Sequence, residues 1–282
     1  MISIVKLGLT FKVMKTRLFL SIFILFSLLF TGTGQAFIPE APHLLYLVIS
    51  KIKRPVGIEA RQTRTILNYQ DSGPPYIELE EKLLFAYPDK LRIQVLSQDL
   101  ASFSVESDFE FVKIIDGALF SSDKSLIDLY SDILLYRDHE TLLNQLDLWG
   151  IDTTKVSFQR YNDTICYVIG GPLEENQGNN FNFPGLWIEK DTFLPIKYVV
   201  EKNGKRVEFF YKNWQKISKT MYPMQIHIFL DNRLFAMINL NNVHLRSGFL
   251  PILFDINTII SLYPKDRLWN DKTETSIQYG HE

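Results

Sequence analysis

Most of the chain after residue 57 alternates between apolar and polar residues with a period of two, which predicts β-strands. The segment 90–96 shows the pattern clearly, because its odd positions are apolar and three of its four even positions are polar in KLRIQVL. Comparable segments follow one another along the chain, separated by short turns such as Asp116-Gly117 and Asn203-Gly204. Eight to eleven strands are therefore predicted, among them 58–68, 76–85, 109–115, 156–160, 164–169, 186–189, 196–202, 205–211, 224–230 and 234–245.

Two segments have the helical period instead. In residues 42–52, Pro42 suits a first turn and apolar residues recur at positions 45, 48, 49 and 52. In residues 125–149, two apolar stripes flank Asp138, which can cap a second helix, and Gly150 can end that helix. Strands interrupted once by a helical pair predict one α+β domain built on a long antiparallel sheet.

The N-terminus has the order of a secretory signal. Four basic residues precede the uncharged run 18–30 (LFLSIFILFSLLF), and small residues at Gly34 and Ala36 suit cleavage. The 13-residue run spans only about 20 Å, which is shorter than a ~30 Å hydrocarbon core. We expect a signal peptide at 1–36, a domain at 37–262 and a polar tail at 263–282. An uncleaved anchor is the alternative, and Met14 could be the true start.

Charge excludes one large class of function. The chain carries 30 basic and 32 acidic residues, a net charge of −2, and lacks the excess of basic residues that nucleic-acid binding requires. Removing residues 1–36 takes away four basic and no acidic residues, which leaves 26 against 32 and a net charge of −6. An exported, mildly acidic protein that does not bind nucleic acid is expected.

The sequence offers no convincing catalytic or metal site. Its one cysteine, Cys166, excludes an intramolecular disulfide and lies in an alternating segment, which favours a buried strand residue over a reactive thiol. The five histidines show no metal-ligand spacing, and a structural role is expected for them. The acidic residues Glu78, Glu80 and Glu81 are expected on a solvated strand face. We predict no cofactor and no enzymatic activity.

Several strands are apolar on both faces, whereas the strands of a sheet with one solvent-exposed face alternate between apolar and polar residues. Phe209 and Phe210 are adjacent, as are Ile228 and Phe229, and residues 83–85 read LLF. Each of the two apolar faces must be shielded from water, by other parts of the protein or by a ligand. One alternative is barrel closure or a simple cover of helices, and the other is a curved sheet whose concave face binds an apolar ligand such as acyl chains.

A series of motifs, in this order, resembles the LolA/LolB-like superfamily of periplasmic lipoprotein carriers and lipid-binding proteins. An N-terminal helix and an extended strand precede residues 87–93 (YPDKLRI), which look like the family's proline-containing turn, and a strand that ends at Asp116-Gly117. Further matches are LWIEKDTFLPIK at 186–197, YKNW at 211–214 and MYPMQI at 221–226. The resemblance covers most of residues 42–256.

This resemblance implies a strongly curved, unclosed antiparallel sheet, a half-barrel, with helices packed in its concave face. In the family, the cavity between sheet and helices accepts lipid acyl chains. The chain departs from LolA itself at Tyr87, where the family has an arginine that latches the helices. It also lacks the cysteine through which a LolB-type acceptor is anchored. The resemblance therefore supports the fold and the ligand class more strongly than it supports the role of a lipoprotein shuttle.

Strand parity selects the residues expected to contact the ligand. The strand candidates are Leu91, Ile93, Val95, Tyr198, Val200, Phe209, Tyr211, Ile226, Ile228 and Met237. The helical candidates are Leu129, Ile133, Leu143 and Leu146. A register slip of one residue would exchange the strand set for its neighbours.

Two functions from different classes follow. The first is a non-catalytic periplasmic carrier that binds a lipid or the acyl chains of a lipoprotein in a hydrophobic cavity. The second is a sensor or interaction module of the same fold that docks an inner- or outer-membrane envelope protein. An envelope hydrolase would require a polar cluster in the concavity.

Overall fold

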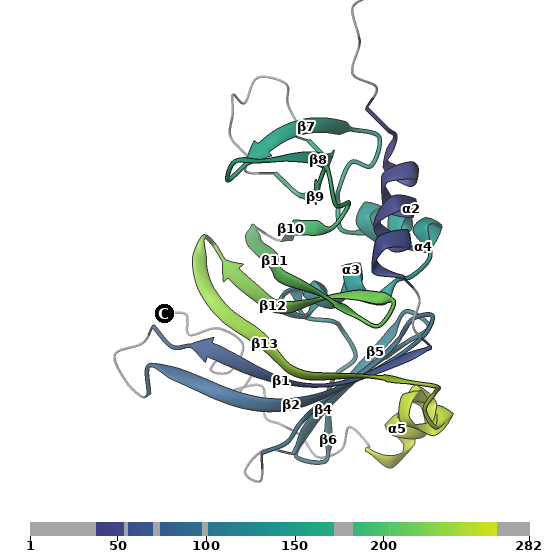
Figure 1. Ribbon diagram of the computed structural model, residues 1–282. Coiled ribbons are helices and arrows are strands. Elements are labelled where there is room, and N and C mark those ends of the chain that lie inside the picture. The colour runs from purple at the N-terminus through teal and green to yellow at the C-terminus, as the bar shows by residue number, and fades with distance from the viewer. Residues whose placement is uncertain are drawn as a thin grey trace, which may run out of the picture. The chain divides into compact units, whose positions relative to one another are not determined.

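Thirteen antiparallel strands form one continuous sheet in the computed structural model, which describes residues 38–53, 56–69, 74–97, 101–171, 183–202 and 204–263 (Figure 1). The strands are β1 (Gly57–Leu67), β2 (Tyr76–Ala86), β3 (Lys90–Val95), β4 (Ser102–Ser107), β5 (Glu110–Ile115), β6 (Ala118–Ser121), β7 (Val156–Tyr161), β8 (Thr164–Gly170), β9 (Gly185–Glu189), β10 (Pro195–Lys202), β11 (Lys205–Ile217), β12 (Thr220–Leu230) and β13 (Arg233–Arg246).

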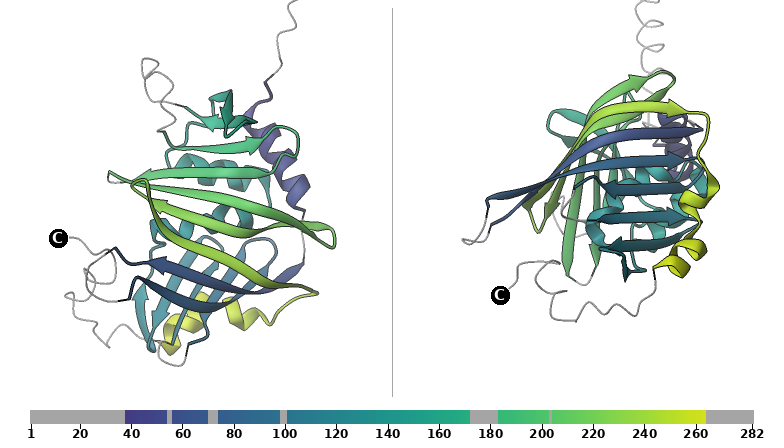
Figure 2. Two further views of the ribbon diagram at one scale, coloured as in Figure 1. Left: turned by 60° about the vertical axis from the view of Figure 1, so that its left-hand side comes forward. Right: turned by 90° about the horizontal axis from the view of Figure 1, so that it is seen from below.

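The order of the strands is β6-β5-β4-β3-β2-β1-β13-β12-β11-β10-β9-β8-β7. The first strand, β1, therefore lies in the middle of the sheet, and the following strands are added outward to the edge at β6. It then crosses to the opposite edge at β7 and meanders back until β13 pairs with β1. The edge strands β6 and β7 do not pair with each other, so the curved sheet stays open (Figure 2). The predicted unclosed, curved antiparallel sheet is confirmed.

The crossing segment between β6 and β7 supplies most of the helices. It contains the 3-10 helix η1 (Leu126–Ser131), α3 (Asp132–Leu135) and α4 (His139–Leu148), and α2 (Ala41–Ile52) packs against α4. We call η1, α3, α4 and α2 the helical cover. A connection that runs from one edge of a sheet to the other must pass over a face, and here it passes over the concave face. Figure 1 shows α2, α3 and α4 together on that side.

The local signals predicted from the sequence explain where these helices begin and end. Pro42 occupies the first turn of α2, whose apolar stripe is buried. The Asp138 carboxylate accepts a hydrogen bond of 3.0 Å from the backbone N–H of Thr141 and caps α4. Gly150 follows α4 with φ of 75°, a conformation that glycine adopts without steric cost. The predicted helical pair over 125–149 is present, with its first member divided between the 3-10 helix η1 and α3, and residues 136 and 137 separate that member from α4.

A second set of helices covers part of the opposite, convex face. The 3-10 helix η2 (Pro251–Phe254) and α5 (Ile256–Leu262) pack on β3, β4 and β5, and Asp255 caps α5 through the backbone N–H of Thr258. Neither this pair nor strands β4 and β6 were predicted. The expected signal peptide at 1–36, Asn203 of the predicted hairpin turn and residues 264–282 of the expected tail lie outside the described residues.

The apolar interior is divided between the two faces. The largest cluster joins the helical cover to the concave face. A second cluster, which includes Leu84, Val105 and Ile259, lies between β2, β4, β5 and α5. A third surrounds Cys166 and Trp187 on the convex side of β8 to β10. The apolarity of both faces thus reflects a helical cover on the concave side and two smaller clusters on the convex side.

Candidate ligand site on the concave face

The concave face is apolar across strands β10 to β13. Strand register places every second residue of neighbouring strands on it, so that Tyr198 of β10 lies opposite Phe209 of β11, and Phe209 opposite Ile228 of β12. Ile228 in turn lies opposite Ala236 of β13. All four side chains are at most 1% exposed. The face therefore forms a continuous apolar floor beneath the helical cover.

The register places the predicted strand residues on this floor with one exception. The floor includes Leu91, Ile93, Val95, Tyr198, Val200, Phe209, Tyr211, Ile226 and Ile228. Met237 is the exception, because it pairs with His227 and so shares the convex face with it, whereas Ala236 and Ile238 face the cover. The placement of Met237 on the concave face was wrong by one residue, and Ile238 takes that position.

The helical cover closes over the floor with its own apolar residues. Leu129, Ile133 and Leu146 are completely buried against it, and Leu143 is half-buried at its margin. Leu142, which belongs to the second predicted apolar stripe but was not among the predicted contact residues, is also completely buried. All four predicted helical residues belong to the cluster that joins cover and sheet. Because these side chains are buried, the interface between cover and floor is closed to solvent in this structure.

A buried ionic cluster ties η1 to the floor. Arg64 of β1 lies 3.0 Å from the Glu81 carboxylate of β2 and 3.5 Å from the Asp128 carboxylate of η1. The Gln62 amide donates a hydrogen bond of 2.6 Å to Glu81, and the Tyr130 hydroxyl lies 3.3 Å from Arg64. Burial acts to lower the pKa of Arg64, but the charge of Glu81 and its neighbours outweighs this and raises it. Arg64 therefore stays charged.

Glu81 corrects a prediction made from the sequence. Its side chain was expected on a solvated face, but it is only 4% exposed. Strand parity puts it on the concave face beside Leu83 and Phe85, where the guanidinium of Arg64 balances its charge. The sequence contained one usable signal, since Gln62 and Arg64 of β1 share the parity of apolar Ile58 and Ala60.

A second buried cluster ties α3 to β4. The Lys124 ammonium donates hydrogen bonds to the Glu106 carboxylate, at 2.6 Å, and to the Asp132 carboxylate. The Tyr136 hydroxyl donates a hydrogen bond of 2.9 Å to the other oxygen of Glu106. Burial raises the pKa of Asp132 to about 6, and the charge of Lys124 opposes that shift. The helical cover is thus attached to the sheet by two polar clusters as well as by apolar packing.

One cation under the cover has no such partner. Arg137, between α3 and α4, is 1% exposed, and none of its guanidinium nitrogens has a hydrogen-bond partner among the described residues. Its guanidinium carbon lies 5.4 Å from the centre of the Phe85 ring on the floor. Burial lowers the pKa of Arg137 to about 10, so the group remains charged at neutral pH.

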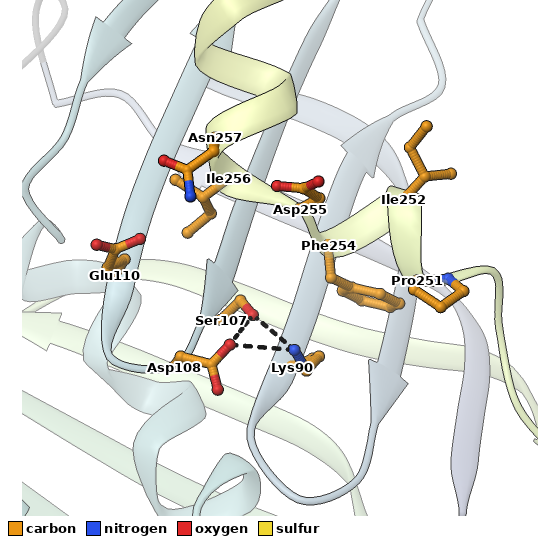
Figure 3. A pocket seen from close by; sticks show the side chains of 10 residues that line it. All are labelled: Lys90, Ser107, Asp108, Glu110, Pro251, Ile252, Phe254, Asp255, Ile256 and Asn257. Carbon is orange, nitrogen blue, oxygen red and sulfur yellow. Dashed lines mark hydrogen bonds and ion pairs between the residues drawn. The ribbon is translucent and has the colours of Figure 1, made fainter.

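A separate hollow of about 420 Å³ lies on the convex side, between strands β3 to β5 and the η2–α5 segment (Figure 3). Lys90 donates hydrogen bonds of 3.1 Å to the Ser107 hydroxyl and to the Asp108 carboxylate at its floor. Asp255 and Phe254 come from the opposite wall. The hollow is open and of mixed polarity, and the cation and carboxylate in it already satisfy each other.

Other kinds of site find little support in the described part of the chain. It contains no group of three or more histidine, cysteine, aspartate or glutamate side chains placed to hold a metal ion. Its helices are all too short or too polar to cross a membrane. Cys166 is buried with its pKa raised to about 11 by burial, as expected for a strand core residue.

Comparison with solved structures shows the fold to which this arrangement belongs. A LolA superfamily protein from Nitrosomonas europaea aligns with a TM-score of 0.54 at 11% identity, over 78% of this chain and 100% of its own. The chain has a LolA-like fold. An outer-membrane lipoprotein-sorting protein domain from Vibrio parahaemolyticus aligns with a TM-score of 0.57 at 11% identity, over 78% of this chain and 97% of its own.

A third structure with the LolA-like fold is a DUF1329 family protein from Desulfovibrio piger. It aligns with a TM-score of 0.52 at 13% identity, over 79% of this chain and 100% of its own. No family model matches the sequence, and no curated protein is detectably similar to it. At these identities the likeness concerns the fold.

Proposed function

We propose that this protein is a non-catalytic carrier of the bacterial cell envelope that binds acyl chains of a lipid or lipoprotein between the concave floor and the helical cover. The observation that carries the proposal is the continuous apolar floor, which is covered by short helices rather than by a second sheet. Each buried methylene group contributes about 0.8 kcal/mol, so a chain of ten or more carbons would compete with the native packing of the cover.

The sequence supports an envelope location. The basic residues, apolar run and small residues of 1–36 have the order of an export signal, and cleavage near Ala36 would release the domain into the periplasm. The structures with the LolA-like fold include a protein described as sorting outer-membrane lipoproteins, which supports a ligand of this class.

Native mass spectrometry of protein purified from the periplasm tests this function. We expect acyl species to co-purify, or added lipopeptide or fatty acid to bind with a stoichiometry near one. The proposal fails if no acyl species co-purifies and no added acyl ligand binds. A stable envelope-protein partner captured by cross-linking, with no acyl binding, would favour the interaction module instead.

Quenching by a brominated acyl chain tests the position of the ligand. Trp149 and Trp214 pack against the concave cluster, whereas Trp187 lies in the convex cluster. Bromine on the chain should quench variants that retain Trp149 or Trp214 and leave a variant that retains only Trp187 unquenched. Trp269, outside the described residues, is replaced by phenylalanine in all of them. Quenching of Trp187 alone would place the ligand on the convex face and contradict the proposed site.

A further inference from the structure

Arg137 is an exception among the buried cations of this fold. Arg64 lies 3.0 Å from Glu81, Lys124 lies 2.6 Å from Glu106, and Lys197 lies 2.7 Å from Glu208. Arg137 is as buried as any of them, yet it forms neither an ion pair nor a hydrogen bond with any described residue. A buried charge without a partner destabilises the folded protein by several kcal/mol. An anion bound next to Arg137 would relieve this destabilisation.

The surroundings of Arg137 place its guanidinium within the proposed ligand site. Its guanidinium lies over the ring of Phe85 on β2, and Tyr222 of β12 is close enough to influence its pKa. Phe85 and Tyr222 are 3% and 4% exposed, and both belong to the cluster that joins floor and cover. Tyr222 stays neutral at physiological pH, because burial raises its pKa to about 12. Its hydroxyl can therefore donate a hydrogen bond but supplies no negative charge.

We propose that Arg137 anchors the acidic headgroup, a carboxylate or a phosphate, of the acyl ligand that binds between floor and cover. This inference rests on the proposed carrier function and narrows its ligand class. A guanidinium binds carboxylate and phosphate oxygens through two parallel N–H donors. A neutral acyl ester offers hydrogen-bond acceptors but no negative charge, so it would leave the charge of Arg137 uncompensated.

The acidic character of the whole protein does not conflict with an acidic ligand. The net charge of −6 expected after loss of residues 1–36 disfavours attraction over long distances, which water and salt screen. The interaction with Arg137 would form at contact distance beneath the cover, where solvent is excluded and charges interact more strongly. Recognition of the headgroup would therefore depend on one local side chain rather than on the field of the protein.

Paired probes that differ only in headgroup charge test the inference. For the carboxylate, affinities for palmitate and palmitic acid methyl ester are compared. For the phosphate, lysophosphatidic acid and the matching monoacylglycerol are compared. We expect the wild-type protein to bind each acidic member at least tenfold more tightly. Arg137→Gln should abolish that preference and leave binding of the neutral member unchanged, and Arg137→Lys should retain part of it.

The outcomes separate failure of the inference from failure of the carrier function. Equal binding of both members of each pair, or an equal loss of both in Arg137→Gln, overturns the headgroup anchor but leaves the carrier. Failure of the wild-type protein to bind any of the four probes overturns both. The ligand-free melting temperature of Arg137→Met provides a control for folding. It should be unchanged or higher than that of the wild type, and a clear decrease would show that the guanidinium has a partner in the protein.

Discussion

The Tyr211 hydroxyl of β11 donates a hydrogen bond of 2.8 Å to the backbone carbonyl of Tyr130 in η1. This bond joins the returning half of the sheet to the helical cover, whereas the Arg64 and Lys124 clusters join the cover to the outgoing half. The crossing segment is therefore held from both halves of the sheet. Displacement of the cover requires these polar contacts to break along with the apolar packing.

Tyr211→Phe should weaken this attachment while keeping the packing of the ring. Loss of the bond leaves a buried carbonyl without this donor, so we expect the free energy of unfolding to fall by about 1–2 kcal/mol. Amide exchange over residues 126–131 should accelerate more than exchange in β8 and β9. Urea denaturation and hydrogen exchange measured by mass spectrometry check both effects.

Tyr198→Phe is the matched control for Tyr211→Phe. Both tyrosines are buried on the concave floor, but the Tyr198 hydroxyl has no hydrogen-bond partner among the described residues. Its removal should leave stability unchanged or raise it slightly, because an unsatisfied buried hydroxyl is costly. A loss in Tyr198→Phe as large as that in Tyr211→Phe would contradict the role assigned to the Tyr211 bond.

Arg64→Met should be strongly destabilising. It leaves the Glu81 carboxylate, 4% exposed, with Gln62 as its hydrogen-bond donor and no cation, and breaking a buried pair in this way costs about 3–5 kcal/mol. The double variant Arg64→Met/Glu81→Leu should recover most of that loss, because it removes both charges. Chemical denaturation of the two variants gives the comparison.

Lys82→Met is the control for the effect of Arg64→Met. Lys82 forms an ion pair of 2.9 Å with Glu59, but its side chain is 38% exposed. Exposed pairs contribute less than about 1 kcal/mol, so this variant should unfold close to the wild-type midpoint. If Arg64→Met were no more harmful than Lys82→Met, the buried cluster would not be a significant attachment of the cover.

The parts of the fold that follow from local patterns could be predicted from the sequence. Alternation located most strands, and Pro42, Asp138 and Gly150 marked helix ends because each acts on its immediate neighbours. Strand β4 was missed because its buried Glu106 and serines read as polar, although Lys124 and Tyr136 satisfy Glu106. That contact spans residues far apart in the chain, which periodicity cannot reveal.

The candidate site shows the same division between local and distant information. Parity placed Phe209 and Ile228 correctly because the β11–β12 register is continuous around them. Parity failed at Met237, where the choice between two adjacent apolar residues depends on the register with β12. Arg137 carried no signal at all, since a single arginine after a helical segment reads as exposed. Its burial results from the packing of the crossing segment on the floor.

Asp132 should make stability depend on pH in a direction opposite to that of most carboxylates. Its pKa is raised to about 6 by burial, above the usual aspartate value of 3.8, so the folded state binds the proton more tightly than the unfolded state. Its contribution to stability is therefore largest below about pH 4 and is lost as the pH rises through 6. Between pH 7 and pH 5 the wild type should gain about 1 kcal/mol relative to Asp132→Asn.

Asp255→Asn is the control for that pH dependence. Hydrogen bonds from Thr258 lower the pKa of the exposed Asp255 carboxyl, so its contribution is present above its unfolded value and is lost only at lower pH. Its difference from the wild type should therefore stay constant between pH 7 and pH 5. Urea midpoints at four pH values distinguish the variants, and a constant difference for Asp132→Asn would contradict the raised pKa.

Cys166 should be unreactive in the folded protein. Its side chain is completely buried in β8, and burial raises the pKa of the thiol to about 11, so little thiolate forms at pH 8. Because it is the only cysteine in the chain, a thiol reagent such as DTNB reports on this position alone. We expect labelling to be at least a hundredfold slower in buffer than in 8 M urea. Rapid labelling of the native protein, with Cys166→Ala as the blank, would show that the convex cluster around Trp187 opens readily.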